Sequence, residues 1–143
     1  MAGTETNQEE PTMTERSDGM CEWRLNGRLH RVNGPAVVYR DGRCEWWQHG
    51  ELHRDGGPAV EWPDGSRMWH QDGKLHRTDG PAVEYRDGRR EWWVEGKLHR
   101  TDGPAVERAD GTCQWWVDGR RTDGPDEPAQ VQVPPSTDLG IDL

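Results

Sequence analysis

The sequence predicts an all-β protein assembled from short β-hairpins, and three observations lead to that prediction. The first is a motif that recurs every 23 residues, most visibly in one tryptophan column. The second is a pair of glycine-containing turn signals in each copy, and the third is the set of short β-branched and aromatic runs between those turns. The tryptophan column consists of Trp23, Trp46, Trp69, Trp92 and Trp115.

The repeat divides the chain into a central array and two tails. The array spans residues 18–125, and its five expected units are 18–40, 41–63, 64–86, 87–109 and 110–125. The fifth unit lacks the Leu-His pair of the others, as expected for a terminal unit that caps a stack. The flanking residues 1–17 and 126–143 are polar and acidic, and the second tail is rich in proline. We expect both tails to be disordered.

Composition and charge exclude several classes of function. Only 30% of the 143 residues are hydrophobic, but nine are tryptophan, so a few large side chains must supply much of the buried area. Of the net charge of −9, most lies in the tails, because residues 1–19 hold five acids and one base and residues 126–143 hold four acids and no base. A nearly neutral array gives no bulk attraction to nucleic acid or to an anionic membrane, so we expect neither as a partner.

The sequence also predicts where the protein resides. No apolar run is long enough to span a bilayer, and the N-terminal residues lack the basic and apolar parts of a secretion signal. The three cysteines, Cys21, Cys44 and Cys113, are an odd number, and free thiols are their simplest interpretation. We therefore expect a cytoplasmic protein.

Each unit carries two turn signals that favour hairpins. An Asp-Gly pair begins at residues 41, 64, 87 and 110, and a polar residue precedes Gly27, Gly50, Gly73, Gly96 and Gly119. Such pairs suit two-residue type I′ turns, which need positive φ at both central positions. Runs such as 44–47 and 58–62 lie between these turns and are predicted to be strands.

A two-residue Asp-Gly turn fixes which residues face each other across a hairpin. In the first of them, Tyr39 would face Cys44 and Val37 would face Trp46, with all four side chains on one side of the sheet. Trp47 would lie on the opposite side, with Leu52 across the next turn. The same register opposes Glu84 to Glu91, which neighbouring arginines could offset or a longer turn would remove.

Joined end to end, the hairpins predict one elongated, twisted antiparallel meander of about ten strands. The alternative is a β-solenoid with one coil per unit, which would stack like residues at a spacing of about 4.8 Å. That stacking would place the aspartate and glutamate columns on themselves, at an electrostatic cost.

The unit resembles a known repeat at Gly96-Lys97-Leu98-His99, with Asp87-Gly88 before it and Gly103 after it. These residues are similar to the MORN (membrane occupation and recognition nexus) repeat, and more so to its variants in bacterial and viral proteins, including antitoxin-like ones. The resemblance covers residues 18–125, although two extra residues separate the His from the following Gly. It implies rows of β-hairpins that bind proteins, or in some cases lipids.

A histidine column invites a metal-binding or catalytic interpretation, but its spacing favours neither. Equivalent residues two strands apart are separated by about 10 Å, too far to share one ion, so we expect each imidazole to bond a nearby linker aspartate such as Asp79 or Asp102. Candidate acids and bases recur in register, unlike a single asymmetric active site, so we expect no enzyme, cofactor or metal. The column consists of His30, His53, His76 and His99.

The tryptophans carry the functional hypothesis. One sheet cannot bury both of its faces, and exposed Trp-rich faces are typical of interaction sites. We therefore expect a non-enzymatic protein-binding module that acts as a scaffold, an inhibitor or an antitoxin-like factor. The alternative is a structural component that assembles with itself as a homo-oligomer. The first-tryptophan column is expected to be structural, and the predicted binding residues are Trp47, His70, Trp93 and Trp116.

The last residues of the chain form a separate candidate motif. Leu139, Ile141 and Leu143 alternate with small or polar residues, a pattern that suits docking as an added strand on a partner. An inert tail is the simpler interpretation.

Overall fold

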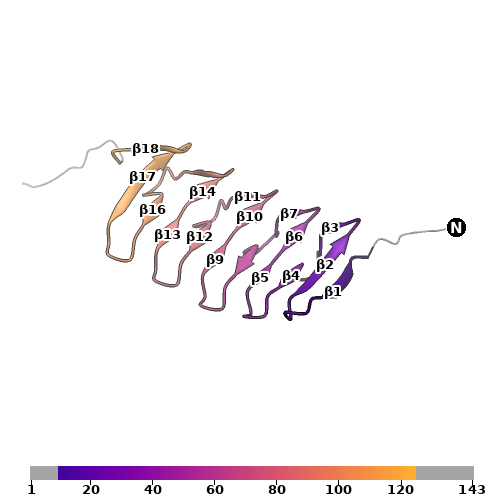
Figure 1. Ribbon diagram of the computed structural model, residues 1–143. Coiled ribbons are helices and arrows are strands. Elements are labelled where there is room, and N and C mark those ends of the chain that lie inside the picture. Colours follow the sequence, from indigo (N-terminus) through magenta and orange to yellow (C-terminus); the bar gives the residue numbers. More distant parts are fainter. Residues whose placement is uncertain (1–9, 125–143) are drawn as a thin grey trace, which may run out of the picture.

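The computed structural model describes residues 10–124, and the regular structure in this range is entirely β (Figure 1). The predicted 126–143 tail and its Leu139, Ile141 and Leu143 motif lie outside the described residues. The strands are β1 (Thr12–Glu15), β2 (Cys21–Leu25), β3 (Arg28–Leu29), β4 (Val37–Val38), β5 (Cys44–Glu45), β6 (Trp47–Gln48), β7 (Glu51–Leu52), β8 (Val60–Glu61), β9 (Arg67–Met68), β10 (His70–Gln71), β11 (Lys74–Leu75), β12 (Val83–Glu84), β13 (Arg90–Glu91), β14 (Trp93–Val94), β15 (Lys97–Leu98), β16 (Val106–Glu107), β17 (Cys113–Val117) and β18 (Arg120–Thr122).

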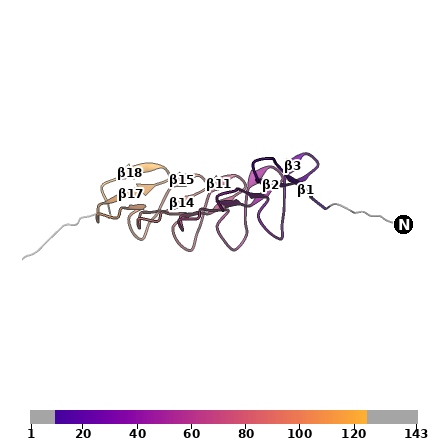
Figure 2. The same ribbon diagram turned by 60° about the horizontal axis from the view of Figure 1, so that its bottom comes forward.

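The strands form one long open sheet and three small hairpins. Twelve strands belong to the long sheet, which follows the chain in the order β1-β2-β4-β5-β8-β9-β12-β13-β16-β17-β18, with β3 on the side of β2. The hairpins β6–β7, β10–β11 and β14–β15 are separate two-stranded sheets. Seen from a second direction, the units still follow one another in a single row (Figure 2). The predicted antiparallel meander is confirmed, since each strand pair in residues 10–124 is antiparallel, whereas stacked solenoid coils would pair in parallel.

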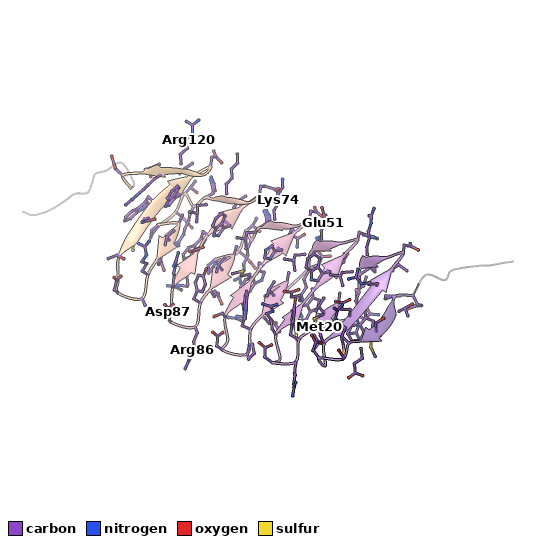
Figure 3. The ribbon with its side chains drawn as sticks, viewed as in Figure 1. Met20, Glu51, Lys74, Arg86, Asp87 and Arg120 are labelled. Atoms are coloured by element: carbon purple, nitrogen blue, oxygen red, sulfur yellow. The ribbon has the colours of Figure 1, made fainter. Side chains whose placement is uncertain are left out.

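The hairpin tips and the Asp-Gly turns lie on opposite long edges of the array. Figure 3 shows Glu51, Lys74 and Arg120 at the edge of the hairpin tips, and Arg86 and Asp87 at the edge of the Asp-Gly turns. Within a unit, the chain rises along a sheet strand, continues into a hairpin, and returns through a linker to the next sheet strand.

The hairpin tips have the turn type that the sequence predicts. Each polar residue before the turn glycine has positive φ, for example 52° at His49, and Gly50 follows with 81°. Both central residues are therefore left-handed, as a type I′ turn requires. Trp47 faces Leu52 across this turn, as predicted.

The predicted register at the Asp-Gly turns was wrong by one residue. Val37 faces Glu45 instead of Trp46, and Cys44 faces Val38 instead of Tyr39. The turn holds three residues, because the N–H of Tyr39 donates to the carbonyl of Arg43, across 40–42. Only the glycine of each Asp-Gly pair has positive φ, which is the pattern of a type I turn followed by a left-handed glycine bulge.

The corrected register removes the like-charge pair, since Glu84 faces Arg90 and not Glu91. It also exchanges the expected neighbours of the two tryptophans. Trp47 shares a face with Glu45, to which its indole N–H donates, and hence with Val37. Trp46 lies on the other face, where Arg54 stacks on it. We call these the valine face and the arginine face.

The core is a narrow band along the array, built from the Pro-Ala-Val segments of the first four units. The four alanines of this segment have no exposed surface, and the valines are at most 4% exposed. Burial of each valine contributes roughly 1.5–3 kcal/mol. Every tryptophan is only half-buried, so the indoles flank the core and do not form it. The core side chains are Ala36, Val37, Ala59, Val60, Ala82, Val83, Ala105 and Val106.

The first end of the array is closed by a strand that the sequence did not predict. Residues 1–17 were expected to be disordered, but Thr12–Glu15 form β1 and pair with β2 along its open edge, with Met13 facing Trp23. All four β1 side chains are exposed, so backbone hydrogen bonds and not side-chain burial hold the strand. A polar, acidic composition indicates only that a segment can bury few side chains. It does not show whether the backbone can pair with an open strand, so it gave no sign of this cap.

Candidate functional site

On the arginine face, each of the first four residues of the tryptophan column carries a stacked arginine. The guanidinium comes from the linker of the same unit and lies about one ring thickness above the indole, the geometry of a cation–π contact. The Cζ-to-centroid distances are 3.9 Å for Arg31 on Trp23, and 3.8 Å for Arg54 on Trp46, Arg77 on Trp69 and Arg100 on Trp92.

Each of these arginines also donates from Nη1 to the carbonyl of the proline four residues later. Nη1 of Arg100 donates to the Pro104 carbonyl at 3.0 Å and to the Glu107 carboxylate at 3.2 Å, and its Nε donates to Asp102 at 2.9 Å. Arg77 binds Asp79 in the same way, and this hydrogen bond and charge lower the pKa of the Asp79 carboxyl. Four of the five tryptophans in the column are thus covered in part by an arginine of their own unit.

The histidine column joins neighbouring units, and only in part through the bonds that the sequence predicted. His53 Nε2 lies 3.2 Å from the linker aspartate Asp55, whereas Asp79 and Asp102 pair with Arg77 and Arg100. A second contact is common to the whole column. Each histidine Nδ1 accepts a hydrogen bond at 3.0 Å from the backbone N–H of a turn residue 19 positions later. The pairs are His30 with His49, His53 with Asp72, His76 with Glu95, and His99 with Asp118.

This bond explains why the histidine recurs. It satisfies a turn N–H of the next hairpin, and the residue that donates it is itself in the strained left-handed conformation. Desolvation, and then the nearby His49, lower the pKa of His30, so its ring is held neutral as the acceptor role requires. Within residues 10–124, no three His, Cys, Asp or Glu side chains lie close enough together to share a metal ion.

The predicted binding residues lie on the valine face, one in each of four successive units. Trp47, Trp93 and Trp116 are half-buried. Each indole N–H donates to the side chain two residues earlier in its strand, an i, i−2 pair on one face. The acceptors are Glu45 and Glu91 at 2.9 Å and Gln114 at 3.1 Å. The three indoles therefore have partners of their own and do not converge on a single site.

His70 is the exception in this column. It is only 8% exposed, and the residue two positions earlier is Met68, which offers no carboxylate. Among the described residues its Nδ1 has no hydrogen-bond partner, and burial lowers the pKa of its imidazole. The third unit thus departs from the pattern of its neighbours.

A row of tyrosine–arginine contacts on the valine face is also interrupted at the third unit. In the second unit Arg43 stacks on Tyr39 at 3.8 Å, and in the fourth Arg89 lies 5.2 Å from Tyr85. Each of these arginines also pairs with the glutamate two residues later, Glu45 or Glu91. In the third unit the two positions hold Ser66 and Met68, so the arginine–glutamate pair is absent there.

The departure opens an apolar gap between two aromatic side chains. A hollow of about 220 Å³ is lined by Trp62, Asp64, Ser66, Met68 and Tyr85. Ser66 is buried, and its Oγ accepts a hydrogen bond from the Arg86 N–H at 3.0 Å. Sequence reasoning missed this site because it followed tryptophans, while the signal was the loss of Arg and Glu from their columns.

Larger hollows lie between successive linkers on the arginine face. One of about 520 Å³ surrounds Trp92, and another of about 560 Å³ surrounds Trp115. Their walls are the arginine, threonine and aspartate side chains of the linkers, of which Arg77 and Arg100 are already paired. The gap in the third unit is smaller, but its aromatic walls are better suited to hold a partner side chain.

Comparison with known proteins provides no family for the chain. None of the known protein-family models matches the sequence, and no curated protein is significantly similar to it. Across residues 10–124, no helix is long and apolar enough to cross a membrane.

Proposed function

We propose that the protein is a non-enzymatic module that binds another protein on its valine face, as a scaffold, an inhibitor or an antitoxin-like factor. The repeated histidines contact the next unit, and the linker arginines contact the tryptophan and aspartate of their own unit, which supports a structural role for these residues. The resemblance of the unit to MORN-type repeats supports a protein partner. The three free cysteines suit the reducing cytoplasm, which we propose as the location.

The observation that carries this proposal is the apolar gap in the middle of the valine face. Charged pairs flank it on both sides, Arg43 with Glu45 and Arg89 with Glu91. Trp62 and Tyr85 line it, and Tyr85 is 36% exposed. A central aromatic pocket with a polar surround is the arrangement that concentrates binding energy in protein interfaces.

A differential capture experiment tests the proposal. Immobilised wild-type chain and the Met68→Ser/Tyr85→Ala variant are exposed to a lysate of the source organism, with Val32→Ser as the matched control. Val32 is 64% exposed and lies in a linker, away from the gap. We expect a protein that binds the wild type and the control equally but is lost on the double variant, and that rebinds when purified. Equal capture by all three folded chains would contradict the proposal.

A second candidate function, self-assembly, is favoured by the ends of the array. Within residues 10–124, each terminal strand pairs on one side only, β1 carrying the exposed Glu15 and β18 the exposed Arg120 and Arg121. Opposite charges on two open edges suit head-to-tail pairing between copies. Light scattering over a range of concentrations separates the candidates, because a constant monomer mass excludes assembly and leaves partner binding untouched.

A further inference from the structure

Aromatic and arginine side chains near the Asp-Gly turns alternate along the middle of the valine face, between residues 39 and 89. In the strand order of the sheet, an aromatic residue after one strand is followed by an arginine before the next. Between residues 39 and 89 the order breaks once, between β8 and β12, where serine replaces arginine; in the first and last units the arginine position holds Met20 and Thr112. The row reads Tyr39, Arg43, Trp62, Ser66, Tyr85 and Arg89.

The unbroken part of the row shows which side chain these positions hold. The Arg43 guanidinium lies 3.8 Å from the Tyr39 ring centre, and the register of β5 and β8 places Trp62 on its other side. Arg89 occupies the equivalent position beside Tyr85, and the register of β13 and β16 places Arg108 on its other side. At Arg43 a planar cation thus lies between aromatic neighbours, which is favourable because the ring faces carry negative potential.

At the break, the neighbouring aromatic side chains remain and the cation is missing. The Trp62 N–H donates to the Ser66 carbonyl at 3.0 Å, so these residues lie opposite each other at the turn, and Tyr85, which directly follows β12, lines the same hollow. The volume of about 220 Å³ is below the range of roughly 300–1,000 Å³ typical of small-molecule sites. The gap therefore suits one inserted side chain rather than a free ligand.

The lining of the gap indicates the chemistry of that side chain. Met68 offers an apolar floor for a methylene stem, and Asp64 offers a carboxylate at the edge of the Asp-Gly turns. Hydrogen bonds from Ser66 lower the pKa of the Asp64 carboxyl, so it stays negative. In the adjoining hollow Asp87 adds a second carboxylate and Arg86 one exposed guanidinium, which leaves a net negative rim.

We propose that the gap between Trp62 and Tyr85 is a receptor for a single arginine side chain of the partner. Its guanidinium enters where Arg43 and Arg89 lie in the neighbouring units, its stem packs on Met68, and Asp64 pairs with its charge. This inference rests on the proposed function and adds to it the anchor residue that a partner must present.

The full-length chain and its Ser66→Arg variant provide the test, because the variant fills the gap with the side chain of the neighbouring units. Random peptides displayed on phage are selected on the wild-type chain and depleted on the variant. We expect the remaining peptides to share an arginine. Its replacement by citrulline, which is similar in shape but neutral, is expected to weaken binding about tenfold or more, and its replacement by lysine less.

Three results would overturn the inference. Peptides that need the gap but anchor it with an apolar residue would show that it is a hydrophobic pocket. Peptides that bind the wild type and Ser66→Arg equally would show that the gap is not used, while the proposed function would stand if Met68→Ser/Tyr85→Ala removed them. A Ser66→Arg chain that fails to fold would show that the gap does not admit a guanidinium.

Discussion

The guanidinium of Arg100 fills the space that a side chain on Gly103 would need. An ideal Cβ on Gly103 would lie 2.6 Å from Cζ of Arg100, and Gly34, Gly57 and Gly80 are each 3.0 Å from the arginine of their own linker. Gly103 is not among the glycines with positive φ, so its conformation alone does not require glycine. Glycine therefore recurs at these four positions because the arginine of each linker leaves no room for a side chain there.

We predict that Gly103→Ala displaces Arg100 from Trp92. The flexible guanidinium yields before the backbone does, so the variant loses the stacking and the hydrogen bonds to Pro104 and Asp102. The expected loss of unfolding free energy is about 2 kcal/mol, measured by urea denaturation. In an Arg100→Ala background the same substitution should cost much less, and equal costs in both backgrounds would contradict the mechanism.

How much of this fold the sequence predicts depends on the turn. Gly50 after a polar residue indicates a type I′ turn, and the hairpin follows with its register. Asp41-Gly42 fits a two-residue turn equally well, but Asp41 Oδ1 accepts a hydrogen bond from the Arg43 N–H at 2.9 Å, which closes a three-residue turn. A dipeptide does not distinguish these two closures, so the face of each side chain stayed uncertain by one position.

The candidate site depended on that register. Alignment of the repeat units already shows Ser66 and Met68 where the neighbouring units have arginine and glutamate. Their meaning appears only once Glu45 is known to share a face with Trp47 and Val37. Counting tryptophans indicated the valine face, but it could not show that the indoles are half-buried and paired.

The histidine column gives a second prediction. His76→Ala removes the acceptor of the Glu95 N–H, which then lacks a partner in a strained turn. We expect a loss of about 1–2 kcal/mol, seen as a lower melting temperature. His76→Asn, whose side-chain oxygen can take the position of Nδ1, should recover part of the loss. If both variants melted alike, packing of the ring and not its hydrogen bond would be responsible.

Stability should fall in mild acid, because burial lowers the pKa of both His30 and His70. The unfolded chain binds a proton at each histidine near pH 6.5, whereas the folded chain binds it only at lower pH. The unfolded state thus gains protons first, and stability that is full above about pH 6.5 declines below it, by at most about 1.4 kcal/mol per pH unit for each histidine. Thermal melts between pH 7 and pH 5 measure this slope.

A matched variant isolates the share of His70. Ser66→Arg/Met68→Glu/His70→Trp converts the third unit to the Arg89, Glu91 and Trp93 pattern of the fourth. At pH 7 its free energy of unfolding should be higher than that of the wild type by about 0.5–2 kcal/mol. Its stability should also fall less steeply as the pH is lowered. Met68→Glu alone should be destabilising, because its half-buried carboxylate would have neither arginine nor indole to pair with. An unchanged acid slope in the triple variant would assign the pH dependence elsewhere.

The shortened fifth unit closes its ladder in a different way from the others. Without the Leu-His pair, Arg121 faces Trp116, and no arginine stacks on Trp115 among the described residues. Gly124 takes the place of the guanidinium, since a Cβ on it would lie 3.4 Å from the Trp115 ring, and its φ of 98° excludes most other residues.

We predict that Gly124→Ala loosens β17 and β18 by about 1 kcal/mol, because the added methyl strains the turn and crowds the indole. Hydrogen exchange should speed up at Trp115 and Trp116 while Val60 and Val83 keep their protection, since each unit of such an array contacts only its neighbours. Uniform loss of protection along the array would mean that the five units unfold as one, and that the last unit is no separate cap.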